Sequence, residues 1–140
     1  IASLHDNVID PGTREENTAA ILGAMRNPAV NIIGHPDNPV YPVDFDALAR
    51  AAKEQHVLLE INNSSYKPNG SRSGSEPYGR QLLAACKQHG TAVICGSDAH
   101  IDLDVGTHAY SWKLIEACGF PEELVVNTSV EKFASFLHVR

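Results

Sequence analysis

The sequence predicts an α/β fold, a parallel sheet with alternating helices, in a single domain that spans residues 1–140. The predicted strands are five apolar segments at residues 1–4, 30–34, 57–61, 92–95 and 124–126. A segment with helical spacing of apolar residues follows each of them. Apolar strands separated by helices are typical of a parallel sheet that helices cover. Because right-handed crossovers direct the strand ends to one edge, we expect the functional site there.

Capping residues mark where the helices begin. The predicted N-caps of the first, second, third and last helices are Thr13, Asp44, Ser75 and Thr128. In the first and last of these, Glu16 and Glu131 stand three positions on and complete a capping-box pattern. The predicted ends are near residues 26, 55 and 90, and a fourth helix is predicted over Thr107–Ala117.

Composition excludes several classes of partner. No apolar run approaches the roughly 20 residues of a membrane span, so we expect no membrane partner. A net charge of −6 without a basic cluster argues against nucleic acid. Cys86, Cys95 and Cys118 lie in apolar stretches and predict buried free thiols, hence a cytoplasmic protein. The chain starts with Ile1 inside a predicted strand, so we expect an N-terminal remainder in a longer protein.

The most informative motif follows the strand at 92–95 and reads Gly96-Ser97-Asp98-Ala99-His100. In an extended chain, side chains two positions apart lie on the same face, so Asp98 and His100 converge just past the strand. A carboxylate and an imidazole at one point suit zinc. The alternative is a polar turn in which Asp98 caps the next element.

Histidines also stand at the ends of two other strands. His5 follows the first and His35 the second, which completes a predicted set of metal ligands, namely His5, His35, Asp98 and His100. This mixed nitrogen and oxygen set suits zinc, manganese or iron. His35 has an alternative role in ordering its Pro-Asp-Asn-Pro loop. Glu60 points to the same edge, either as a ligand or as a support that orients a ligating histidine.

Three further residues are predicted to contact substrate. Asn62 and Asn63 follow the third strand and either donate to substrate oxygens or stabilise a turn. Arg72 lies in the Gly/Ser-rich loop at 67–75, which either reaches an anionic substrate or is only solvated.

The remaining histidines are expected away from the site. His56 and His89 each end a helix at the opposite edge of the sheet, where a cation at a helix C-terminus is favourable. His108 opens a helix and His138 closes the last one, and both are expected at the surface.

Four segments resemble the polymerase and histidinol phosphatase (PHP) family, in particular its YcdX-like branch of bacterial phosphatases. They are Ser3-Leu4-His5-Asp6, the segment 32–39, the segment 59–65 and Gly96-Ser97-Asp98-Ala99-His100. They occur in order and at compatible spacing over nearly the whole chain. The resemblance implies the C-terminal part of a distorted seven-stranded (β/α) barrel, whose N-terminal part and its ligands lie upstream.

The resemblance also implies an activity. Such a protein is a metal-dependent phosphatase that hydrolyses a small phosphomonoester with a metal-activated water, at a site holding up to three zinc ions. Its metal ligands carry over onto the four residues named above, and Asp98 and His100 would be catalytic. Alternatives are a nuclease-type phosphodiesterase of the same family and a non-catalytic module. We expect the chain to be inactive by itself. A homo-oligomer is one alternative for its assembly.

Overall fold

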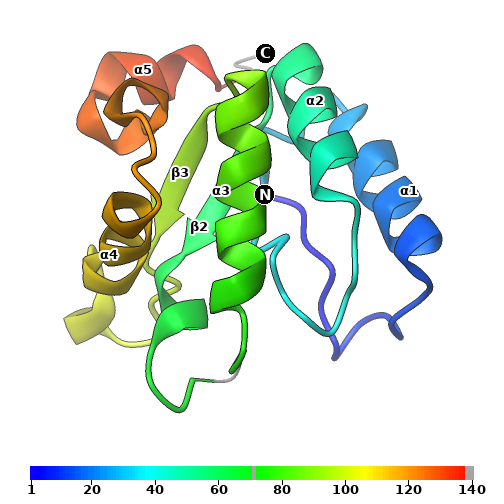
Figure 1. The fold of residues 1–140 in the computed structure, drawn as a ribbon, viewed down its shortest axis with the longest axis horizontal. Coiled ribbons are helices and arrows are strands. Elements are labelled where there is room, and N and C mark those ends of the chain that lie inside the picture. Colours follow the sequence, from blue (N-terminus) through cyan, green and yellow to red (C-terminus); the bar gives the residue numbers. More distant parts are fainter. Residues whose placement is uncertain (71, 138–140) are drawn as a thin grey trace.

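A three-stranded parallel sheet forms the centre of the protein in its computed structural model, which describes residues 1–70 and 72–137. The strands lie in the order β1-β2-β3, and they span Ile32–Ile33, Leu58–Asn62 and Val93–Gly96. Ile33 pairs with Leu59, and Leu59 pairs with Val93. The prediction of an α/β fold with a parallel sheet is confirmed, and the barrel stays a prediction (Figure 1).

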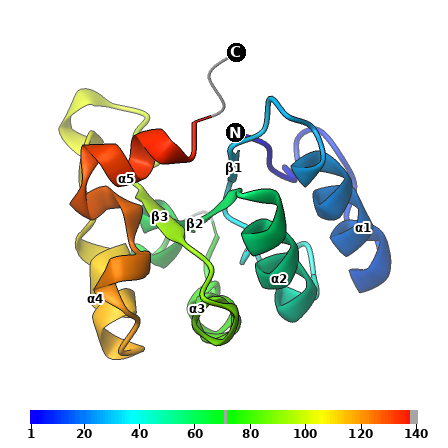
Figure 2. The same ribbon diagram turned by 90° about the horizontal axis from the view of Figure 1, so that it is seen from above.

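Helices follow the strands in alternation. They are α1 (Arg14–Met25), α2 (Phe45–Gln55), α3 (Glu76–His89), α4 (Ala109–Ala117) and α5 (Val130–Ser135). Helix α1 packs against α2, α2 against α3, and α3 against α4. Figure 2 shows that α1 to α4 follow one another around the outside of the sheet. This order is what βα repeats with short connections produce.

The alternation of side chains along each strand divides the core in two. Ile33, Leu59 and Val93 belong to the larger cluster, which includes the buried residues of α1 to α4. Ile32 and Leu58 point to the other face and pack with the segment of Phe133 and Phe136 in and beside α5. Because side chains two positions apart share a face, the second face continues from Leu58 to polar residues at 60 and 62. On this face of β2, the residue at the start of the strand is therefore apolar and the residues toward its carboxyl end are polar.

The two predicted edge strands are much shorter than expected. Residues 1–4 contribute a single parallel bridge between Ala2 and Ile33, and residues 124–126 a single bridge between Val93 and Val125. On the second edge, the side chain of Asn127 takes over the pairing: its Oδ1 accepts from the Cys95 N–H at 2.7 Å, and its Nδ2 donates to the Cys95 carbonyl at 3.0 Å. The side-chain amide of Asn127 thus satisfies the backbone N–H and carbonyl of Cys95, at the edge where the strand 124–126 was predicted to pair.

Two of the predicted N-caps are confirmed. Thr13 and Glu16 form the complete capping box of α1, with the Thr13 hydroxyl accepting from the Glu16 N–H at 3.2 Å. Asp44 caps α2 through the N–H of Ala47 at 3.0 Å.

The other two predicted caps differ from the structure in part. Ser75 is the N-cap residue of α3, as predicted, but its hydroxyl donates to the Arg72 carbonyl and makes no capping hydrogen bond. The cap of α5 is Ser129, whose hydroxyl accepts from the Lys132 N–H at 3.2 Å, because Thr128 still belongs to the preceding 3₁₀ turn, Val126–Thr128. Helix α4 also begins two residues later than predicted, at Ala109.

The sequence also predicts environments for the three cysteines and two of the histidines. All three thiols are free, as predicted, and Cys86 and Cys95 are buried, whereas Cys118 is partly exposed. His108 is half-buried rather than at the surface, and its Nδ1 is buried without a hydrogen bond among the described residues. His138 lies outside the described residues. Within 1–70 and 72–137, no helix has the length and apolar character needed to cross a membrane.

Candidate functional site

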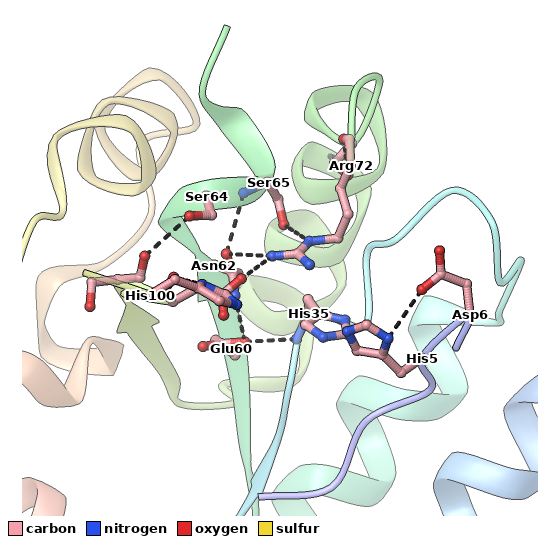
Figure 3. A network of polar contacts seen from close by, with 12 residues as sticks. His5, Asp6, His35, Glu60, Asn62, Ser64, Ser65, Arg72 and His100 are labelled. Carbon is pink, nitrogen blue, oxygen red and sulfur yellow. Dashed lines mark hydrogen bonds and ion pairs between the residues drawn. The ribbon is translucent and has the colours of Figure 1, made fainter. Parts of the chain in front are cut away.

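A cavity of about 480 Å³ lies beyond the carboxyl ends of the strands. Its lining includes seven predicted site residues, namely His5, His35, Glu60, Asn62, Arg72, Asp98 and His100. Six of them lie in or directly after strand-forming segments, and Arg72 comes from the loop before α3. Figure 3 shows the polar contacts that these residues make with one another and with their neighbours. The structure thus brings all four predicted metal ligands to one cavity, while their role as ligands stays a prediction.

The two histidines predicted at the opposite edge lie at helix ends. His56 is the residue after α2, in the left-handed region with φ 55°, and His89 is the last residue of α3. The Nε2 of His89 lies 2.7 Å from Asp46 Oδ1. Neither histidine is among the residues that line the cavity.

Glu60 lines the cavity and contacts two other predicted site residues. Its Oε2 accepts from the backbone N–H of His35 at 2.9 Å and from Asn62 Nδ2 at 3.2 Å. A Cβ on Gly96 would lie 1.9 Å from Glu60 Oε1, so only glycine leaves room for this carboxylate. Burial raises the pKa of Glu60, and the His35 N–H opposes that rise. Glu60 therefore supports His35 through its backbone rather than its ring.

Two of the predicted ligands hold unusual backbone conformations. His35 has φ 32° and Asp98 has φ 52°, both in the left-handed region that residues with a Cβ rarely adopt. Such conformations cost on the order of 1–3 kcal/mol each and are concentrated at functional sites. The strain at both strand ends supports a functional role for this cavity.

The imidazoles are oriented by local contacts. His100 Nδ1 lies 2.9 Å from the carbonyl oxygen of Asp98. If Nδ1 carries the proton and donates to this oxygen, Nε2 is the ring nitrogen that can bind a metal ion. His5 Nδ1 lies 3.1 Å from Asp6 Oδ1. The rings of His5 and His35 meet edge to face with centroids 5.9 Å apart. Hydrogen bonding of one ring nitrogen is the usual way in which a metal-binding histidine is held.

The surroundings of His35 lower the pKa of its ring and so favour the neutral form. Burial and then the positive charge of Arg72 lower the pKa, against the smaller effects of a backbone hydrogen bond of His35 itself and of the Asp98 charge. Neutral imidazole is the form that binds a metal ion. The environment of His35 therefore favours the protonation state that the predicted ligand role requires.

Arg72 connects the loop before α3 to two strand ends. Its Nε donates to Ser65 Oγ at 2.8 Å, and its Nη2 donates to Asn62 Oδ1 at 3.1 Å and to Asp98 Oδ2. Burial alone would raise the pKa of Asp98, but the hydrogen bond and charge of Arg72 outweigh it and hold that pKa below its ordinary value. The alternative that this arginine is only solvated is excluded by its contacts, since 11% of its side chain is exposed.

The two asparagines have different positions. Asn62 lines the cavity, and its Oδ1 also accepts from the Ser65 N–H at 3.3 Å, so the predicted turn-stabilising role is present. Asn63 is buried, and its Oδ1 accepts from the N–H groups of Tyr110 and Ser111 at the start of α4. The substrate role of Asn63 stays a prediction, beside a structural contact that the sequence did not suggest.

Sequence reasoning also missed a buried acid beside the site. Asp37 is fully buried, accepts a hydrogen bond from the Tyr66 hydroxyl through Oδ2, and has no partner for Oδ1 among the described residues. Burial raises its pKa to about 6. It lies in the Pro-Asp-Asn-Pro loop after β1, and nothing in the sequence indicates that its carboxylate turns inward.

Asp37→Asn should change the pH dependence of stability in the metal-free protein. A raised folded-state pKa means stability that is complete below pH 3.8 and is lost as the pH rises through about 6. The difference corresponds to about 3 kcal/mol above pH 6, which the variant should gain relative to wild type. Urea unfolding from about pH 3.5 to pH 8 measures this, because the loss of stability accumulates between the two pKa values. Parallel stability profiles for the two proteins would contradict it.

The donors fit zinc by chemistry, since imidazoles and a carboxylate form the mixed set that this metal takes. They are not gathered around one point: among residues 1–70 and 72–137, no three His, Cys, Asp or Glu side chains lie close enough to hold an ion. The Arg72 contact to Asp98 accounts for part of this, because it uses a carboxylate oxygen that the set would need.

An α/β sheet whose strand ends present histidines, carboxylates and one arginine to a shared cavity has the layout of an α/β enzyme site. No family model matches the chain. The chain is 46% identical over 140 residues to a protein named "Probable phosphatase" from Clostridium acetobutylicum, covering 100% of this chain and 57% of the relative. Relatives of the same name from Clostridium novyi and Caldanaerobacter subterraneus are 45% and 47% identical, covering 98% of this chain and 55% and 54% of theirs. The chain spans about half the length of these relatives.

Proposed function

We propose that the protein containing this chain is a metal-dependent phosphatase that hydrolyses a small phosphomonoester. The observation that carries the proposal is the convergence of His5, His35, Asp98 and His100 with Arg72 on one cavity. The names of the relatives support the phosphatase class. The PHP resemblance supports zinc, with manganese or iron as alternatives. The free thiols fit a reducing compartment, and we place the activity in the cytoplasm.

Each side chain has a defined part in this proposal. His5, His35, Asp98 and His100 would hold the metal, which when bound acidifies a water and polarises a phosphoryl oxygen. Arg72 and Asn62 line the same cavity and would donate hydrogen bonds to phosphoryl oxygens. Glu60 holds the backbone of His35 in place. Positioned donors of this kind stabilise charge that develops on the phosphoryl group.

A phosphomonoester is favoured over nucleic acid by the charges at the cavity. Arg72 is the one arginine or lysine among the described lining residues, and its charge is shared with Asp98. A nuclease that follows a phosphate backbone needs several cations along a groove. The overall charge of −6 points the same way.

The test is a comparison of substrates with the natural full-length polypeptide. The protein is stripped with a chelator, reloaded with zinc or manganese, and given p-nitrophenyl phosphate, its diester analogue and a single-stranded oligonucleotide. We expect turnover of the monoester only after reloading. Preferred cleavage of the diester and the oligonucleotide would identify a nuclease instead, and metal binding without turnover of any substrate would identify a non-catalytic module.

A further inference from the structure

We propose that Arg72 holds Asp98 in the metal-free protein and releases it when a divalent cation binds, which makes the guanidinium available to the phosphoryl group. Arg72 is then a positioning residue that couples metal binding to anion binding. The inference rests on the proposed function for the identity of the two ligands. Its test measures binding alone, so it can fail while the phosphatase proposal stands.

The first step is the contact between Arg72 and Asp98. Arg72 Nη2 donates to Asp98 Oδ2, and 11% of the Arg72 side chain and 29% of the Asp98 side chain are exposed. An ion pair this far from solvent is stronger than a surface pair, because water screens it less. Asp98 is therefore engaged by a cation that belongs to the chain itself.

The second step is that this contact excludes a metal ion from the same oxygen. A carboxylate oxygen that coordinates zinc lies about 2.0–2.2 Å from the ion. The guanidinium at that oxygen would bring two positive charges into close contact, which is strongly unfavourable in a partly buried site. Asp98 can thus serve Arg72 or a metal at Oδ2, and the two cations compete.

The third step is that Arg72 keeps its place when Asp98 leaves it. Its Nε is bonded to Ser65 Oγ at 2.8 Å, and its Nη2 is also bonded to Asn62 Oδ1 at 3.1 Å. Both partners are neutral and come from β2 and the turn after it, not from the segment of Asp98. The guanidinium therefore stays at the cavity with an unneutralised charge and an N–H that has lost its acceptor. A phosphoryl oxygen is the natural replacement.

This competition predicts a reciprocal coupling between zinc and phosphate. Zinc on Asp98 frees Arg72 for phosphate, and phosphate on Arg72 frees Asp98 for zinc. Without zinc, Arg72 should add little to phosphate affinity, because Asp98 neutralises it. The Asp98→Asn variant should bind inorganic phosphate more tightly than wild type when no zinc is present.

A double-mutant cycle in the natural full-length polypeptide tests the coupling, with zinc alone as the first probe. We expect Arg72→Gln to tighten zinc binding about tenfold by calorimetry in the wild-type background and to have a much smaller effect in Asp98→Asn. Arg80→Gln is the matched control, since Arg80 pairs with Glu76 on exposed α3, and it should change nothing. Weaker or unchanged zinc binding in Arg72→Gln, or equal tightening in both backgrounds, would overturn the proposal.

Inorganic phosphate is the second probe. In zinc-free protein we expect Asp98→Asn to bind phosphate about tenfold more tightly than wild type, and Arg72→Gln to match wild type. With zinc present, Arg72→Gln should bind it about tenfold more weakly than wild type. Arg72→Lys keeps the charge without the planar fork and covers the case in which the glutamine variant does not fold. Zinc-free Asp98→Asn with unchanged phosphate affinity would refute the release of Arg72.

Discussion

His100→Ala should lower the phosphomonoesterase activity of the full-length protein by more than about 100-fold. Even the outer hydrogen-bond partners of metal ligands are worth about 10–100-fold, and His100 is itself a proposed ligand. It lines the cavity with its Nδ1 2.9 Å from the Asp98 carbonyl, so the loss removes a pre-oriented nitrogen. Steady-state kinetics and metal content after reloading measure the effect, and both should fall together.

His89→Ala is the matched control for this loss. His89 is also a histidine with a partner, since its Nε2 lies 2.7 Å from Asp46 Oδ1, but it ends α3 away from the cavity. The variant should keep its activity and its metal. If His100→Ala and His89→Ala behaved alike in both measurements, the assignment of His100 as a ligand would be wrong.

The fold was predictable where one segment carries its own signal. Apolar runs and turn residues located β2, β3 and the three long helices, and the caps Thr13 and Asp44 were read from local patterns. The edge strands were not predictable in this way. Their length depends on partners distant in sequence, such as the Asn127 side chain that pairs with Cys95.

The convergence of the strand-end side chains on one cavity was predictable, whereas their contacts were not, and their roles stay predictions. Histidines and carboxylates at strand ends must meet, because a parallel sheet brings those ends together. Which atoms pair there depends on side-chain geometry across separate loops. The contact of Arg72 with Asp98 joins residues 26 positions apart, and no periodicity indicates it. The left-handed backbone of His35 and Asp98 is likewise a tertiary property.

The 140-residue chain expressed by itself is expected to bind at most one zinc ion weakly and to have no useful phosphatase turnover. A catalytic zinc takes about three protein ligands and a water, so a three-metal site needs roughly nine ligands. The proposed set in this chain has four, and among the described residues no three acidic, histidine or cysteine side chains form a metal-binding group. Arg72 also donates a hydrogen bond to Asp98, the one carboxylate proposed as a ligand.

The measurement compares this chain with the full-length Clostridium acetobutylicum relative, of which it covers 57%, and with the matching segment of that relative. Each protein is equilibrated with zinc, freed of excess metal by desalting, and assayed for bound zinc and monoester turnover, with circular dichroism to verify folding. The full-length relative should retain both properties, and the two shorter chains should retain neither. Two or more tightly held zinc ions with turnover in the 140-residue chain would show that its own donors suffice. The ligand set would then have to include side chains beyond His5, His35, Asp98 and His100, with Glu60 the first candidate because its carboxylate already lines the cavity.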